Sequence, residues 1–442
     1  MKASALKYAI LSITAVIITL ILILVPFHAF LTVWAASTFG HYTAFLLWEE
    51  YLLVIAGIGA LYLVVFDRKV RLSTLYHGLT WLIAGYLVVQ LVWGLGALHY
   101  HTVDAKAVAY GVLVNSRFLI FFLAAWVVGS RTKRLANRWS WVLLWPAVIV
   151  IVFGILQVVV LPVDFLKHVG YSSQTILPYE TINHNAHYVR IMSTLRGANP
   201  FGAYLLLPIS ALVVLMAVGK RNWQRLGMLL GAIVTLFFTF SRSAWVGAVL
   251  SGATVPLTRL RSLRVRRWWG AVAVGLLVVL VGVVIGFRHN TRLQNVLFHT
   301  QTHSAVATTS DQGHASALKA GLHDLIHEPL GRGPGTAGPA SVYNNHPARI
   351  AENYYIQIGQ EVGWLGLLLF AGINAYVAVL LWQRRQDPLA LTLLASLIGI
   401  SFVNLLSHAW TDETLAFLWW GLAGIAIGAA AHDTDGQGSE AT

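Results

Sequence analysis

The sequence contains no cysteine, and only 11% of its 442 residues are charged. The missing thiols exclude disulfide bonds, thiolate metal ligands and a cysteine nucleophile. The low charge, with 57% hydrophobic residues, excludes an ordinary soluble domain. Internal repeats, low-complexity tracts and a separate soluble domain are also lacking. We therefore expect an all-α fold, a polytopic membrane helix bundle that forms a single domain over residues 1–442.

Apolar runs recur from one end of the chain to the other. A helix needs roughly 20 mostly apolar residues to cross a bilayer. On this criterion the sequence predicts about 12 transmembrane helices, at 8–31, 42–66, 75–95, 108–129, 140–161, 198–219, 225–241, 243–257, 269–287, 353–381, 389–406 and 413–431.

Acidic residues are scarce beside basic ones, with 17 Asp and Glu against 30 Lys and Arg. Most of the basic residues fall in the N-terminal tail and in the loops after the even-numbered spans. The positive-inside rule then places both termini and these loops in the cytoplasm. We expect a multi-pass protein of the plasma membrane, with the lipid bilayer rather than nucleic acid as the partner of its positive charge.

Two predicted outer loops, 162–197 and 288–352, are too long for simple turns. Long loops on a rigid scaffold commonly carry binding or catalytic groups. The second loop, between spans 9 and 10, predicts a surface helix that begins at Ser310 and ends before Pro329. Its apolar stripe consists of Leu318, Leu322, Leu325 and Ile326. Residues 432–442 are predicted to form a disordered cytoplasmic tail.

Three arginines are candidate anion-binding residues. Arg242, in "FFTFSRSAWVG", separates two short apolar runs, and a guanidinium near the membrane interior is costly unless it meets an anion. Arg190 and Arg196 come shortly before "GANPFG" and the start of a helix, where backbone N–H groups also favour anions. The alternative for all three is an ordinary contact with lipid headgroups.

Glu352 stands at the head of the tenth span, in "AENYYIQIGQEVGWLG". Asn353, Gln357 and Gln360 continue along one helical face, and a polar face at this depth must look into the bundle or a cavity. Glu352 is a candidate proton acceptor; the alternative is a first-turn acid favoured by the helix dipole.

Other polar residues give weaker signals. His314, Asn353 and Tyr355 are possible substrate-binding residues at the membrane mouth. Histidine pairs in "HNAH" and "HDLIH" lack an evident third ligand, so no metal site is predicted. The "GRGPG" loop follows no strand and is not a dinucleotide fingerprint. Glu49 and Glu50, beside Trp48, are interpreted mainly as an anchor at the membrane interface.

The segments "RIMSTLRGANPFGAYLLLPI", "FSRSAWVG", and "HEPLGRGPGTAG" followed by "ENYYIQIGQEVGWLGLLLF" resemble, in this order, the O-antigen ligase and polymerase family of bacterial surface polysaccharide assembly. "WEE" in the second predicted span adds to the likeness, which covers most of the chain and is most specific over 190–370. It implies a membrane glycosyltransferase that uses an undecaprenyl-pyrophosphate-linked glycan at the outer face, without a nucleotide sugar, metal or other cofactor.

The resemblance also implies roles for particular residues. The family arginines thought to hold the pyrophosphate correspond to Arg190, Arg196 and Arg242. Glu352 occupies the place where ligases commonly carry a histidine, and Phe201 the place of an expected asparagine. The glutamate at this place favours a polymerase, or a ligase whose acceptor is not lipopolysaccharide. In either enzyme Glu352 would be the catalytic base.

Three functions follow as hypotheses. The first is transfer or polymerisation of the lipid-linked glycan onto the hydroxyl of a glycan or glycolipid acceptor. The second is a transporter or flippase for lipid-linked oligosaccharide or an anionic polymer, although the sequence shows no inverted symmetry. The third is a non-catalytic scaffold.

Overall fold

The computed structural model describes residues 2–182, 185–219, 222–259 and 310–439, and its fold is a bundle of membrane-length helices. The α-helices are α1 (Lys2–Leu24), α2 (His28–Phe39), α3 (Tyr42–Leu46), α4 (Trp48–Phe66), α5 (Arg68–Leu75), α6 (Gly78–His99), α7 (Ala105–Gly129), α8 (Arg134–Val159), α9 (Ala198–Val218), α10 (Trp223–Phe238), α11 (Arg242–Arg259), α14 (Ser310–His327), α15 (Tyr354–Gln383), α16 (Pro388–Asn404) and α17 (Glu413–Ser439). Short 3-10 helices occur at η1 (Val25–Phe27), η2 (Phe165–Val169), η3 (Gly338–Tyr343) and η4 (Ala409–Thr411), and one hairpin is formed by β1 (Glu180–Ile182) and β2 (Asn185–Arg190).

The described helices confirm a polytopic, mostly helical membrane protein. Eight of them are long and apolar enough to cross a bilayer, and α10 and α16 are shorter apolar helices. The predicted span at 243–257 lies within α11. The span at 269–287 lies outside the described residues, so the total of twelve stays a prediction.

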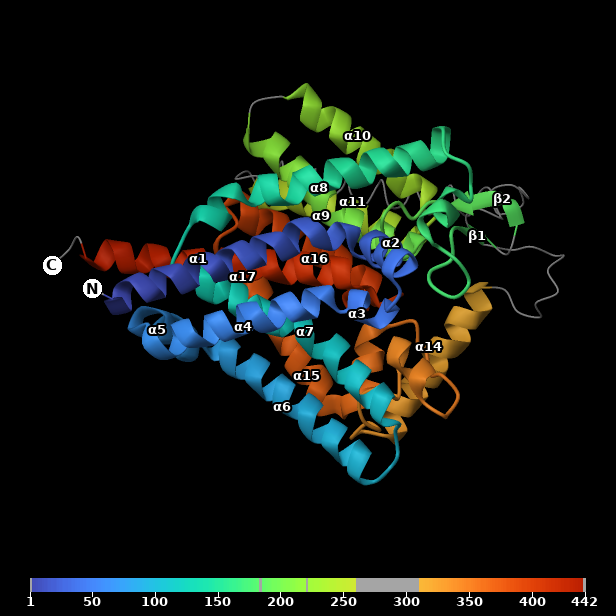
Figure 1. Ribbon diagram of the computed structural model, residues 1–442, viewed down its shortest axis with the longest axis horizontal. Coiled ribbons are helices and arrows are strands. Elements are labelled where there is room, and N and C mark those ends of the chain that lie inside the picture. The colour runs from blue at the N-terminus through green and yellow to red at the C-terminus, as the bar shows by residue number, and fades with distance from the viewer. Residues whose placement is uncertain (1, 183–184, 220–221, 260–309, 440–442) are drawn as a thin grey trace.

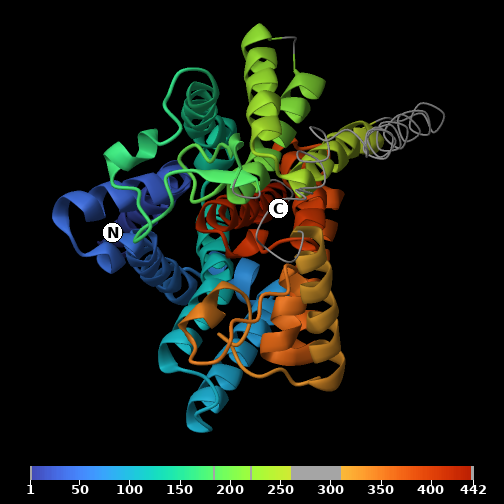
Figure 2. The same ribbon diagram turned by 90° about the vertical axis from the view of Figure 1, so that its right-hand side faces the viewer.

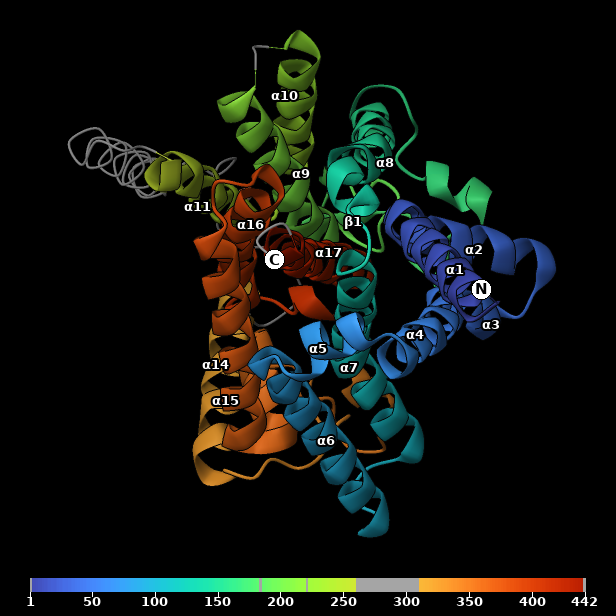
Figure 3. The ribbon, with the colours of Figure 1, turned by 90° about the vertical axis from the view of Figure 1, so that its left-hand side faces the viewer.

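The N and C labels lie at one end of the bundle, and the hairpin of β1 and β2 and the start of α14 lie at the other (Figure 1). Figure 2 looks onto this second end. Figure 3 shows both labels on the face turned toward the viewer, N beside α1 and C beside α17. The predicted helix in the second long loop is present as α14. The last helix, α17, extends to Ser439 and includes most of the segment predicted as a tail.

The centre of the bundle is the pair α7 and α17, which pack against each other along much of their length. Small residues allow the close approach: a Cβ atom at Gly424 or Gly428 would overlap a carbonyl oxygen of α7. Membrane helices pack through such contacts because lipid is as apolar as a leucine side chain. Trp419 and Trp420 of α17 are fully buried beside this seam.

Gly424→Ala is expected to destabilise the protein by about 1–3 kcal/mol because the added methyl group overpacks the α7–α17 seam. The measurement is thermal unfolding of the purified protein in detergent. The matched control is Gly57→Ala in α4, where a Cβ atom would meet nothing within 4 Å. Equal unfolding temperatures for the two variants would contradict the close approach.

Candidate functional site

The first long loop contains a β-hairpin that the sequence did not predict. Strands β1 and β2 are antiparallel, and Glu180 pairs with Arg190 in their register. Arg190 is the last residue of β2, immediately before the backbone N–H of Ile191 bonds to the carbonyl of Phe238 at 3.2 Å. The hairpin therefore fixes Arg190 against the end of α10.

Arg190, Arg242 and Glu352 line one cavity of about 560 Å³. They come from three separate segments: the end of β2, the first residue of α11, and the residue two before α15. The floor and walls are completed by residues of α9, α11, α14, α16 and the turns beside them: Asn199, Phe240, Ser241, Ser243, Val246, Ala315, Leu318, Ala351, Phe402, Leu405, Leu406 and Ser407. The volume is in the range of small-ligand pockets.

Arg190 is oriented by three oxygen atoms. Its Nε donates to the carbonyl of Thr239 at 2.9 Å, its Nη2 donates to Asn199 Oδ1 at 2.5 Å, and its Nη1 lies 3.4 Å from Glu180 Oε2. Burial, together with the nearby positive charge of Arg242, lowers the pKa of Arg190, while Glu180 opposes the shift. An arginine still keeps its proton. A bound anion would relieve the repulsion between the two guanidinium groups.

Glu352 adopts a left-handed backbone conformation, with φ of 54°. The next residue, Asn353, is the N-cap of α15: its Oδ1 accepts from the N–H of Ile356, and its Nδ2 donates to the carbonyl of Leu405, both at 3.0 Å. A non-glycine residue in this region is strained, and such strain is concentrated at functional sites. The cap and the turn together hold Glu352 at the cavity wall.

The other predicted site residues lie elsewhere. Asn353 serves as the helix cap, and Tyr355 packs with the apolar core near Phe370. His314 belongs to α14, but its side chain lies outside the described part of the structure. The substrate-binding roles of these three residues stay predictions.

Arg196 does not line the cavity but belongs to a buried charge cluster. Its Nη1 lies 3.3 Å from Glu413 Oε2, and Glu413 Oε1 lies 3.2 Å from Arg117 Nη2. Arg117 also binds Glu50. The negative charge of Glu413 raises the pKa of Arg196. Of the three arginines predicted to bind pyrophosphate, Arg190 and Arg242 line one cavity and Arg196 lies outside it, beside Glu413. Their binding role stays a prediction.

The same cluster corrects the interpretation of Glu49 and Glu50 as interface anchors. Glu49 is 0% exposed and Glu50 is 8% exposed. Glu49 Oε2 lies 2.8 Å from His28 Nδ1, and its Oε1 lies 3.9 Å from Arg117 Nη1. Buried charges must be paired because desolvation is costly. The acids turn into the bundle to meet Arg117, which the sequence analysis did not single out.

The glycine loop after α14, residues 331–335, is bound at a break in α15. Val362 and Gly363 have non-helical backbone angles. In an unbroken helix the N–H of Trp364 would bond to the carbonyl of Gln360. Here Trp364 donates to Pro329 at 3.0 Å, and the Gln360 carbonyl accepts from Arg332 at 3.0 Å. The loop thus supplies the partners that the break leaves without an intrahelical bond.

Glu361 completes this attachment, and the sequence analysis overlooked it. The Glu361 carbonyl accepts from Gly333 N–H at 2.7 Å. Its fully buried carboxylate accepts from Gly335 N–H at 2.8 Å and from Asn115 Nδ2 at 2.6 Å. An acid inside an apolar helix was the available signal, since such residues are rare and usually have a defined partner. The glycine loop is therefore anchored to both α7 and α15.

Comparison with known proteins adds the family. The model described as O-antigen ligase matches residues 226–371. Over this segment the chain is similar to the O-antigen ligase family. The matched residues include Arg242, the glycine loop and Glu352, whereas Arg190 precedes them. None of the curated proteins compared matches the chain. The O-antigen ligase match and the apolar helices together support an integral membrane protein with a glycosyltransferase-like function in O-antigen assembly.

Arg117→Gln is expected to destabilise the protein by about 3–5 kcal/mol because it leaves buried carboxylates without their cation. The measurement is thermal unfolding in detergent. Arg131→Gln is the control, because Arg131 binds Asp67 at 3.0 Å with 26% of its side chain exposed, and such pairs contribute about 0–1 kcal/mol. An Arg117 variant as stable as the control would show that the cluster is not held by this cation.

Proposed function

We propose that the protein transfers a glycan from a polyprenyl pyrophosphate, of the undecaprenyl type, to an acceptor hydroxyl at the outer face of the plasma membrane. The observation that carries the proposal is the convergence of Arg190, Arg242 and Glu352 on one cavity. Two cations suit a diphosphate, and a carboxylate suits a hydroxyl proton. The O-antigen ligase match supports the reaction class.

In the proposed reaction the acceptor oxygen attacks the anomeric carbon of the donor glycan. The bond between that carbon and the pyrophosphate oxygen breaks, and polyprenyl pyrophosphate leaves with the bonding electrons. Glu352 takes the proton of the acceptor hydroxyl. Arg190 and Arg242 stabilise the negative charge that develops on the leaving oxygen, where preorganised donors are most effective.

The arrangement of the chain ends agrees with the orientation proposed for this site. The cavity is formed beside the long loops, at the end of the bundle opposite both termini (Figure 1). With the termini in the cytoplasm, as the distribution of basic residues predicts, the cavity opens on the extracytoplasmic side. The acceptor is a glycan or glycolipid, and Glu352 in the histidine place favours a polymerase or a ligase with an acceptor other than the usual one.

Arg242→Ala, Arg190→Ala and Glu352→Gln are each expected to lower transfer by about 10²–10³-fold, as loss of a charge-stabilising donor or general base does. The measurement is turnover of a synthetic undecaprenyl-pyrophosphate oligosaccharide with glycan and glycolipid acceptors by purified protein. Glu352→Gln keeps the size of the side chain and removes its basic group.

The matched control is Arg68→Ala, because Arg68 is an exposed residue of α5 that does not line the cavity. Normal turnover in all three cavity variants would refute these roles. Translocation of the lipid-linked glycan across vesicles without any glycosidic bond formation would favour the transporter instead.

A further inference from the structure

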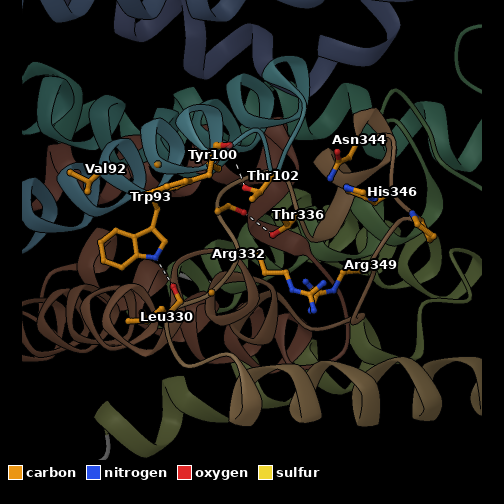
Figure 4. Close-up of a pocket in the computed structure, with 15 residues that line it drawn as sticks. Val92, Trp93, Tyr100, Thr102, Leu330, Arg332, Thr336, Asn344, His346 and Arg349 are labelled. Carbon is orange, nitrogen blue, oxygen red and sulfur yellow. Dashed lines mark hydrogen bonds between the residues drawn. The ribbon is translucent and has the colours of Figure 1, made fainter.

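A second cavity, of about 710 Å³, lies between the C-terminal half of α6 and the loops after α14 (Figure 4). A neighbouring cavity of about 500 Å³ shares Thr102, Asn344 and His346 with it. The two cavities therefore adjoin, and together they are called the α6 groove hereafter. The sequence predicted no site residue here. Two adjoining cavities suit a chain of several sugars better than a single compact headgroup.

Aromatic side chains form one wall of the α6 groove. Trp93 and Tyr100 both line it, and Tyr100 is 75% exposed. The indole N–H of Trp93 donates to the carbonyl of Leu330, which fixes the ring beside the glycine loop (Figure 4). Aromatic faces offer broad apolar contact at a low entropic cost, and their polar edges tolerate water. The C–H faces of sugar rings pack on such surfaces.

The two arginines that line the α6 groove are both paired with carboxylates. Arg332 and Arg349 both bind the carboxylate of Glu328, and Arg349 also binds Asp324. Two cations thus meet two carboxylates, and the groove has little attraction for an anion. Paired guanidinium and carboxylate groups still present many hydrogen-bond donors and acceptors in fixed positions.

Amide groups and the carboxylate of Asp104 continue this polar lining. Asn344 Oδ1 accepts from the N–H of Asp104 at 3.3 Å, and Asn345 Nδ2 donates to Asp104 Oδ1 at 2.9 Å. These bonds tie the loop to the start of α7. Rigid polar groups around an apolar wall give specificity for a polyhydroxylated ligand.

We propose that the α6 groove binds a neutral saccharide chain, the acceptor or growing glycan of the transfer reaction. The naming of this chain as acceptor rests on the proposed function, but the binding itself does not. Arg349 lines the groove, and Glu352, three residues later, lines the first cavity. Three residues span at most roughly 11 Å. The chain segment that joins the two cavities is therefore short.

The test measures binding of lipid-free oligosaccharides to the full-length protein in lipid nanodiscs, on an array of defined neutral and acidic bacterial glycans of five or more sugars. The wild type is expected to bind at least one neutral glycan. Tyr100→Ala is expected to weaken that binding tenfold or more, and Tyr100→Phe, which keeps the ring, to restore most of it. Inorganic pyrophosphate is expected not to compete.

The matched control is Tyr76→Ala, because Tyr76 is 79% exposed and follows α5, outside the groove. No neutral glycan bound, equal binding by Tyr100→Ala, or displacement by pyrophosphate would overturn the proposal. Glycan binding without any turnover would leave the groove intact and refute the proposed function. Turnover without binding of any lipid-free glycan would refute glycan binding in the α6 groove and leave the proposed function standing.

Discussion

Hydrogen bonds across the break in α15 hold the loop after α14, and both cavities are built on that loop. The backbone of Gly333 and the side chain of Glu361 fix one end of it. Its other end carries Arg349 into the α6 groove and Glu352 into the first cavity. Glycines are required at the attachment because Gly331, Gly333 and Gly335 all have positive φ and approach other backbone atoms or helix side chains closely. The strained turn at Glu352 thus lies between two fixed residues, Arg349, which binds Asp324, and Asn353, which caps α15.

The buried charge cluster has a different role from the arginines of the cavity. Arg117, in α7, binds carboxylates of α4 and α17. It therefore links three helices in the interior of the bundle, where a charge without a partner would be costly. Arg196 extends this cluster toward solvent, with 42% of its side chain exposed. Arg190 and Arg242 instead line a cavity, and Arg190 is held there by Glu180, Asn199 and the carbonyl of Thr239. Arginines close together in sequence therefore lie in separate surroundings.

The helices and several candidate site residues were predictable from the sequence. Apolar spacing marks a helix, and a charged residue near the membrane interior needs a partner. The helix at α14 followed from its apolar spacing and its stop at Pro329, and the structure confirms it. Arg190, Arg242 and Glu352, singled out from the sequence, line one cavity, and their roles stay predictions. The β-hairpin was not predictable, since its strands are only three and six residues long and mix polar with apolar residues.

The overlooked residues depend on tertiary partners that no local pattern reveals. Glu361 makes sense only beside Asn115 of α7 and the backbone of Gly335. The direction of Glu49 and Glu50 depends on Arg117, which is 67 residues from Glu50 in the sequence. Polar residues inside apolar spans were visible in each case, but their pairing was not.

The most direct measurement is a cryo-electron microscopy structure of the protein in nanodiscs with a non-hydrolysable bisphosphonate analogue of the lipid-linked glycan. We predict that both phosphorus centres lie between the guanidinium groups of Arg190 and Arg242, with the anomeric carbon facing Glu352. Phosphorus density against Arg332 and Arg349, or at Arg196, would contradict the assignment of the donor to this cavity.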